Sequence, residues 1–220
     1  MFRDAVLPSG AALIMVDEVT SENMILVIPG ACENILAEEI YLAEERISRA
    51  DVFVTQLETN LDAVEKAVDL AWEKGIKVIL NPAPVQQISD DLLKKVYVLT
   101  PNEVEASVLS GIDVRTVEDA KLAAQVLRKR GVANVIITLG KNGSLLSTAT
   151  QEIHVPPMIV DVVDTTGAGD AYNGGLATGI SEGMDLLQAA RFATVTSALS
   201  VTQMGTAPAM PYRDQIDLNI

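Results

Sequence analysis

Two carboxylates flank a glycine-rich turn in the sequence Asp164-Thr-Thr-Gly-Ala-Gly-Asp170. An extended segment ends just before Gly167 and an apolar helical pattern begins after it, so the backbone N–H groups of residues 168–170 are expected to converge on one point. The dipole of the helix adds roughly half a positive charge there. Converging N–H groups and a positive dipole bind phosphate oxygens, and the turn is therefore predicted to be an anion cradle.

Asp170 would stand beside the bound anion, where a negative side chain is costly unless it performs a task. The task that fits is to take a proton from an attacking hydroxyl group. A structural interpretation stays open, because an aspartate can also cap an ordinary helix that follows a glycine turn. No lysine follows the glycines, so the stretch is not the G-x-x-x-x-G-K-S/T phosphate loop.

Composition limits the partners of this chain. The 220 residues are 49% hydrophobic, and 16 basic against 30 acidic side chains give a net charge of −14. This charge repels nucleic acid and anionic membranes, so neither is expected as a partner. No apolar run approaches the roughly 18 residues of a membrane span, and the first residues lack the order of a secretory signal, so the cytosol is the expected location.

The elements that must position the turn alternate along the chain. Two short strands at residues 11–17 and 23–29, joined by a polar turn at 18–22, predict a hairpin. Further strands are expected at 51–57, 77–80, 96–99, 134–138 and 144–148, and helices at 37–48, 61–74, 90–95, 102–110, 117–130, 169–181 and 185–203. This alternation predicts an α/β fold with a doubly wound, mostly parallel sheet and helices on both faces.

Ligands of such sheets bind at the carboxyl ends of the strands. Glu58, Asn81, Asn102 and Gly140 each follow a predicted strand and are therefore candidates. For Asn81, in the sequence N-P-A-P, a turn is the preferred interpretation. Asn102 with Glu105 also has the spacing of a capping box, so a helix cap alone would explain that pair.

The stretch DTTGAGDAYNGG at residues 164–175 resembles the C-terminal signature of the ribokinase-like, or PfkB, family of carbohydrate kinases. Further segments match in the family's order: SGAALIMV, TQLE, NPAP, TPNEVEASVLSG, TLGKNG and VTQMGTAP. The resemblance runs from about Ser9 to the end of the chain. It implies a ribokinase-like fold, ATP as the phosphoryl donor, a sugar as the acceptor, and Mg²⁺ with a monovalent cation such as K⁺ as cofactors.

The resemblance also implies roles for the residues at matching positions. Asp170 would be the general base, and the anion hole would be the backbone of Gly167, Ala168, Gly169 and Asp170. Contacts with the nucleotide would come from Asn102, Glu105, Thr138, Gly140, Gly143 and Thr194. Of these residues, Asn102 and Glu105 would also help to place Mg²⁺. Contacts with the sugar would come from Glu58, Ala12 and Ile14. The monovalent cation would be held by Asp164, Thr166, Val201, Met204 and Gly205, with Ala209 where relatives often have serine.

One part of the family pattern is unmatched. Met1 lies eight residues before Ser9, whereas family members carry a longer N-terminal part with a GGKGAN-type segment that grips the sugar. We therefore expect residues 1–33 to be the β-hairpin of a lid and residues 34–220 to be an N-terminally incomplete α/β core. The resemblance further implies a homodimer formed through the lid.

Three functions stay open at this point. The first is a sugar kinase that converts D-ribose to D-ribose 5-phosphate. The second is a nucleotide-binding module without kinase activity, and the third is a kinase for another sugar or a nucleoside.

Overall fold

The computed structural model describes residues 3–16 and 23–220, so the predicted hairpin turn at 18–22 lies outside the described residues. The strands are β1 (Ala11–Val16), β2 (Asn23–Ile28), β3 (Val52–Thr55), β4 (Lys77–Leu80), β5 (Val98–Leu99), β6 (Asn134–Thr138), β7 (Ser144–Ser147) and β8 (Glu152–Val155). The helices are α1 (Ala37–Leu42), α2 (Glu44–Ile47), α3 (Leu61–Glu73), α4 (Asp90–Leu93), α5 (Glu103–Ser110), α6 (Val117–Lys129), α7 (Ala168–Ser181), α8 (Leu186–Ser200) and α9 (Arg213–Asp217). Short 3-10 turns are η1 (Gly30–Asn34), η2 (Gly140–Asn142) and η3 (Ala207–Ala209).

The central sheet has the strand order β3-β4-β5-β6-β7-β8 within the described residues. Strands β3 to β6 run parallel, and β7 is antiparallel to both of its neighbours. The predicted mostly parallel sheet with helices on both faces is confirmed. Strand β8 was not predicted; it occupies the edge of the sheet beyond β7.

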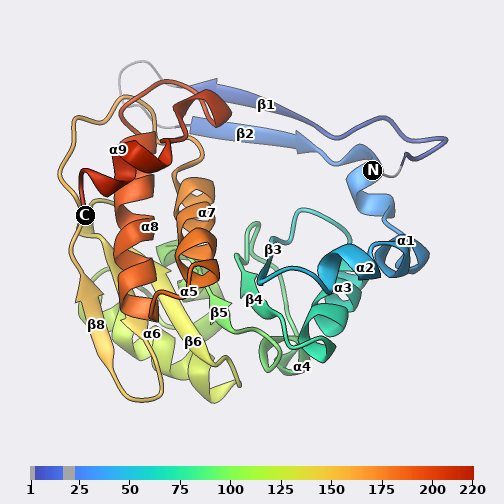
Figure 1. The fold of residues 1–220 in the computed structure, drawn as a ribbon, viewed down its shortest axis with the longest axis horizontal. Helices are drawn as coiled ribbons and strands as arrows, with labels where there is room; N and C mark the ends of the chain where they lie inside the picture. The colour runs from blue at the N-terminus through green and yellow to red at the C-terminus, as the bar shows by residue number, and fades with distance from the viewer. Residues whose placement is uncertain (1–2, 17–22) are drawn as a thin grey trace.

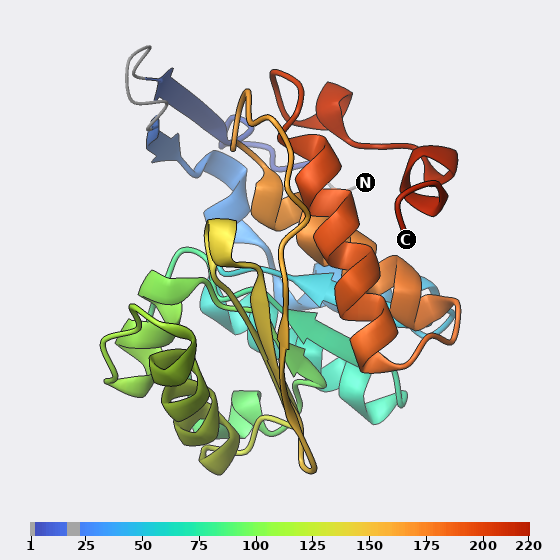
Figure 2. The same ribbon diagram turned by 90° about the vertical axis from the view of Figure 1, so that its left-hand side faces the viewer.

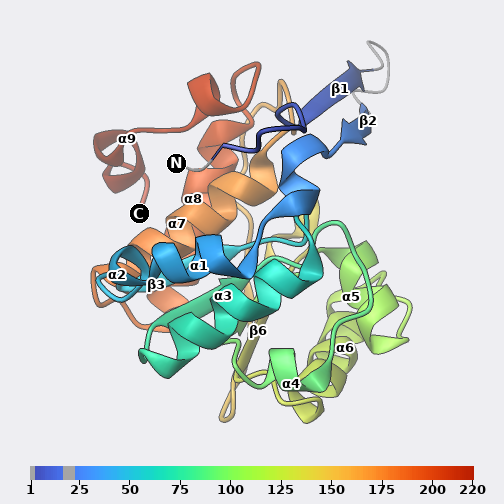
Figure 3. The same ribbon diagram turned by 90° about the vertical axis from the view of Figure 1, so that its right-hand side faces the viewer.

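Two helical layers cover the sheet, and alternate strand residues face opposite layers. Ile79, Val98 and Ile136 pack in one core with α7 and α8, whereas Leu80 and Leu99 pack in another with α3, α4 and α6. All five side chains are fully buried. Figure 2 shows the sheet between α5 and α6 on one side and α7 and α8 on the other, and Figure 3 shows the same layers from the opposite side. Burial on both faces explains the continuous apolar runs of the parallel strands.

The hairpin forms a separate two-stranded sheet. Strands β1 and β2 pair antiparallel, with Ala12 opposite Val27. Figure 1 shows this hairpin reaching across the end of the molecule near the start of α7. Many of its apolar side chains are exposed, among them Leu13 and Leu26. Because a two-stranded sheet alone is of marginal stability in water, the hairpin depends on the groups that pack on it.

The single helix predicted for residues 37–48 is wrong, because the structure divides it into α1 and α2 at Ala43. No residue of either short helix is buried, so the core imposes no continuous helical register there. No helix in the described part of the chain is both long enough and apolar enough to span a membrane.

Candidate functional site

The glycine turn joins the loop after β8 to the start of α7. Gly167 is the N-cap of α7 and has φ +79°, a left-handed conformation that favours glycine. The N–H of Ala168 donates to the Thr165 carbonyl at 3.2 Å. The N–H groups of Gly169 and Asp170 have no backbone acceptor among the described residues. These two N–H groups and the helix dipole therefore form the candidate anion site, whereas three converging N–H groups were expected.

Two cavities meet at this turn. The first, here called the hairpin cavity, has a volume of about 880 Å³ and lies between β1–β2, the ends of β3 and β4, and α7. The second, here called the α8 cavity, has a volume of about 530 Å³ and lies between the turns after β5 and β6, the loop after β8, and α8. The turn lines both: Thr166, Gly167 and Asp170 face the hairpin cavity, and Thr165, Ala168 and Gly169 face the α8 cavity. A group bound on one side can therefore reach a group bound on the other.

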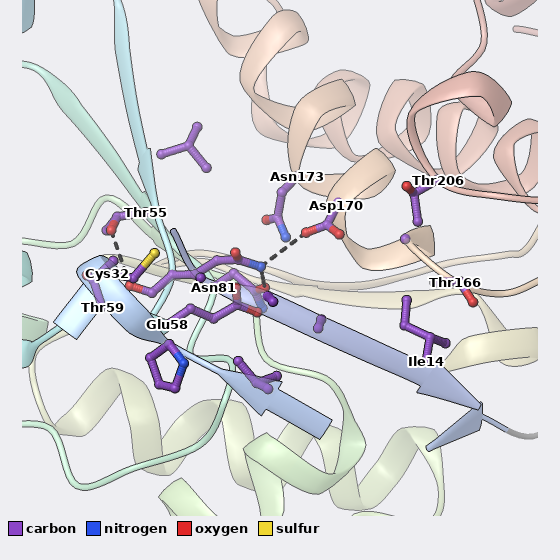
Figure 4. Close-up of a pocket in the computed structure, with 18 of the residues that line it drawn as sticks. Ile14, Cys32, Thr55, Glu58, Thr59, Asn81, Thr166, Asp170, Asn173 and Thr206 are labelled. Atoms are coloured by element: carbon purple, nitrogen blue, oxygen red, sulfur yellow. Dashed lines mark hydrogen bonds between the residues drawn. The ribbon is translucent and has the colours of Figure 1, made fainter. Parts of the chain in front are cut away.

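The hairpin cavity contains the three residues predicted to contact the sugar. Ala12, Ile14 and Glu58 all line it together with Asp170. Figure 4 shows Asp170 entering from α7, with Glu58 across the cavity and Ile14 on the hairpin. The side formed by the hairpin is thus apolar, whereas α7 and the segments after β3 and β4 contribute carboxylates and amides. This mixture suits a small polar molecule with an apolar face.

Several lining residues of the hairpin cavity were not predicted. Gln56 and Asn173 contribute side-chain amides, and Thr206 contributes a hydroxyl. Gln56 was not predicted because the strand was expected to run over residues 51–57, whereas β3 ends at Thr55. Asn173 follows Asp170 by three positions on a helix, so it lies on the same face.

The α8 cavity contains five of the six predicted nucleotide contacts, namely Asn102, Thr138, Gly140, Gly143 and Thr194. Glu105 is different, since it is only 7% exposed and does not line the cavity. Its two carboxylate oxygens accept the backbone N–H and the side-chain amide of Asn102, both at 2.9 Å, and its own N–H donates to Asn102 Oδ1 at 2.9 Å. Burial raises the pKa of the Glu105 carboxyl. Glu105 thus holds Asn102, and the expected capping box is formed.

The two glycines of the turn after β6 have different reasons to be glycine. At Gly143, with φ +85°, a Cβ would lie 2.1 Å from the Val155 carbonyl oxygen of β8. At Gly140, with φ +49°, the nearest atom would be a Glu103 carboxylate oxygen at 3.8 Å. Strand packing alone therefore explains Gly143, whereas the space beside Gly140 opens toward the α8 cavity.

A buried phenol forms part of the wall of the α8 cavity. Tyr172 on α7 lies within hydrogen-bond distance of Ser144 Oγ, 3.1 Å from its hydroxyl oxygen. Burial raises the pKa of Tyr172 to about 12. Tyr172 therefore ties α7 to β7 behind the candidate anion site and stays neutral at physiological pH.

Asp164 joins the glycine turn to the loop after α8. Its Oδ2 accepts the N–H of Gly205 and its Oδ1 accepts the N–H of Thr166, each at 2.9 Å. These two hydrogen bonds lower the pKa of the Asp164 carboxyl, and the bond from the N–H of Gly205 has the larger effect. The Val201 carbonyl accepts the N–H groups of Asp164 and of the residue before it, at 3.2 and 2.8 Å.

The backbone around Asp164 offers oxygen ligands of the kind that a monovalent cation needs. The carbonyls of Thr166, Met204 and Gly205 accept no hydrogen bond from any described residue, and are free to bind a cation. The Val201 carbonyl already accepts two hydrogen bonds and has no lone pair to spare. Of the backbone carbonyls predicted to hold the cation, those of Thr166, Met204 and Gly205 thus keep unused lone pairs, and that of Val201 does not.

Comparison with known proteins matches nearly the whole chain to one family. The sequence profile described as pfkB family carbohydrate kinase matches residues 2–213. Ribokinase of Haemophilus influenzae is 38% identical over 207 residues, which are 94% of this chain and 67% of that protein. Deoxyribokinase of Salmonella typhi is 37% identical over 210 residues, which are 95% of this chain and 68% of that protein. The structure of Arabidopsis thaliana ribokinase complexed with ribose and ATP has a TM-score of 0.86 at 29% identity, covering 97% of this chain and 69% of that one.

Proposed function

Because this chain belongs to the pfkB family of carbohydrate kinases, we propose that it transfers the γ-phosphoryl group of ATP to the primary hydroxyl of D-ribose. The products are ADP and D-ribose 5-phosphate. The observation that carries the proposal is the glycine turn between two cavities, with Asp170 on one side and Ala168 and Gly169 on the other. The sugar would occupy the hairpin cavity and the triphosphate the α8 cavity. The Arabidopsis thaliana relative is a ribokinase complexed with ribose and ATP, which supports the choice of these two ligands.

The chemistry assigned to Asp170 is general base catalysis. Its carboxylate takes the proton of the hydroxyl group while the hydroxyl oxygen forms a bond to the γ-phosphorus. The bond between the γ-phosphorus and the bridging oxygen breaks, and the electron pair leaves with ADP. The N–H groups of Gly169 and Asp170 would stabilise the charge on the transferring group. Because the protein supplies little covalent chemistry in such a reaction, its main task is to position the reactants.

Two cations belong to the proposal. The described part of the chain holds no group of three or more His, Cys, Asp and Glu side chains that could bind a metal ion. Mg²⁺ would therefore take most of its ligands from the phosphates and water, beside the turn that Asn102 begins. When bound, it neutralises negative charge on the phosphate oxygens. A monovalent cation such as K⁺ would bind near Asp164 through the free carbonyls named above and add positive charge behind the anion site.

The test is the phosphorylation of D-ribose by the chain and by its Asp170→Asn variant, with the product identified by phosphorus NMR. The amide has nearly the same shape but cannot accept the proton, so the rate is expected to fall by about 100- to 10,000-fold. ATP binding, measured by calorimetry, is expected to remain.

Asp62→Asn is the matched control, because Asp62 is an exposed aspartate in the first turn of α3, as Asp170 is in the first turn of α7. If Asp170 only completed its helix, both variants would behave alike. Substantial ribose phosphorylation by Asp170→Asn would refute the base assignment.

A different acceptor sugar is the second candidate function. It is favoured by the 37% identity with a protein named deoxyribokinase, which is almost equal to the 38% identity with a protein named ribokinase. The ratio of kcat/KM for ribose and for deoxyribose decides between them. Calorimetry with ATP and with each sugar separately tests for a nucleotide-binding module, which would bind ATP and neither sugar.

A further inference from the structure

The first residues after three neighbouring parallel strands are polar, and the sheet brings them side by side. Gln56 follows β3, Asn81 follows β4 and Thr100 follows β5, and the last residues of the three strands are paired in register. Ile79 and Val98 face α7 and α8. Side chains two positions further along a strand point the same way, so Asn81 and Thr100 also face α7.

A chain of hydrogen bonds runs along this row and ends at Asp170. Gln56 Nε2 donates to Asp170 Oδ1 and to Asn81 Oδ1, both at 3.1 Å. Asn81 Nδ2 donates to the backbone carbonyl of Thr100 at 3.0 Å. Figure 4 shows Asn81 below Asp170, joined through the drawn hydrogen bonds. Asn81 and Thr100 are buried, so their polar groups depend on these partners.

Groups that can only accept hydrogen bonds fix the orientation of both amides. A backbone carbonyl only accepts, so Asn81 must turn its NH₂ group toward Thr100 and its oxygen toward Gln56. Gln56 must then present its own NH₂ group to Asn81, and the second proton of that group points to Asp170. An ionised carboxylate also only accepts, so one arrangement satisfies every member of the row.

A second branch holds the helix that carries Asp170. Thr100 Oγ1 donates to Asn173 Oδ1 at 2.7 Å, and Asn173 Nδ2 donates to the Gly169 carbonyl at 2.9 Å. Asn173 is buried. The first turn of α7 is therefore fastened to the same strand end, Thr100, that orients the amides.

We propose that Gln56 is a positioning residue for the general base, an inference that rests on the proposed function. Its amide holds Asp170 Oδ1, while no described residue donates a hydrogen bond to Oδ2, which is left to take the hydroxyl proton. An amide is neutral, so it orients the carboxylate without placing a countercharge beside it. The buried row behind Gln56 prevents the amide from turning, so the side chain of Asp170 is held before the substrate arrives.

Kinetics of Gln56→Met test the proposal, because methionine has a similar length and no donor. We expect kcat to fall by about 10- to 100-fold with the KM values for ribose and ATP unchanged. Gln86→Met is the matched control, since Gln86 is also partly buried and donates to the Leu57 carbonyl at 3.2 Å without contacting Asp170. An unchanged kcat for Gln56→Met, or a higher KM for ribose with kcat preserved, would overturn the positioning role.

NMR of the side-chain amides gives a readout that needs no turnover. The Asp170→Asn substitution is expected to move the NH₂ resonances of Gln56 and to leave those of Gln86 in place. Resonances of Gln56 that stay unmoved would refute the inference whatever the activity. If the resonances move but the wild-type chain does not phosphorylate ribose, the proposed substrate is wrong. The hydrogen bond by which Gln56 orients Asp170 would still be supported.

Discussion

Two adjacent glycines of α7 are expected to respond to alanine in opposite directions. Gly175 is buried against α8, and a Cβ there would lie 2.7 Å from Thr196 Oγ1 and 2.9 Å from Ala193 Cα. Gly174 is exposed, and a Cβ there would meet nothing within 4 Å. Both glycines lie inside the same helix, so the better helix propensity of alanine applies equally to both. Only the packing differs.

The difference in packing sets the expected magnitudes. Gly174→Ala should raise the free energy of unfolding by about 0.5–1 kcal/mol. In Gly175→Ala the same gain is outweighed by overpacking against a backbone atom of α8. The free energy of unfolding should therefore fall by about 1–2 kcal/mol. In a chain of this size such a loss lowers the melting temperature by about 2–8 °C.

Thermal and urea unfolding of the two variants beside the wild type make the comparison. Each variant is the other's control, because both add one methyl group to the same helix. Equal stability of the two variants would show that α7 and α8 do not make the close contact described here.

Two further predictions concern pH. The N–H groups that Asp164 accepts lower its carboxyl pKa, so its contribution to stability is present above the unfolded-state pKa of about 3.9 and is lost as the pH falls through the folded-state pKa. Thermal melts should therefore show Asp164→Asn less stable than wild type at neutral pH, with the gap closing in acid; a gap that is constant with pH would contradict this. The pKa of Tyr172 is raised to about 12, so this phenol should ionise last in an alkaline absorbance titration, and the stability that its raised pKa confers should decline from about pH 10 upward. Tyr172→Phe should remove that late step, and an unaltered titration curve would refute the assignment.

The sequence was sufficient to predict the layers of the fold, because each central strand is buried on both faces and reads as an apolar run. Strand β8 was not predicted because it lies at the sheet edge and only Val155 of its four residues is buried, so it forms no apolar run. Its residues do alternate between polar and apolar, but four residues are the shortest alternation that indicates a strand. The capping box at Asn102 was predictable because both partners lie within one turn of the chain.

The site was predicted less completely wherever it depends on contacts between distant segments. The amide of Gln56 reaches Asp170 because β3 lies against α7, and it reaches Asn81 because β3 and β4 pair in register; no local pattern specifies either arrangement. The number of free N–H groups in the glycine turn depends on whether Ala168 donates back to Thr165, which the residue types alone do not specify. Gln56 lies inside the strand expected at 51–57, whereas β3 ends at Thr55, so the misplaced strand end concealed the first residue after it.

The described residues that line the hairpin cavity all differ from those that line the α8 cavity. If the sugar binds in the hairpin cavity and the nucleotide in the α8 cavity, as proposed, the two ligands are recognised by different sets of residues. Substitutions on β1 or β2 would then alter the choice of acceptor and leave the donor side as it is. A chain built this way can change what it phosphorylates, while the turn between the cavities, and the phosphoryl donor behind it, stay the same.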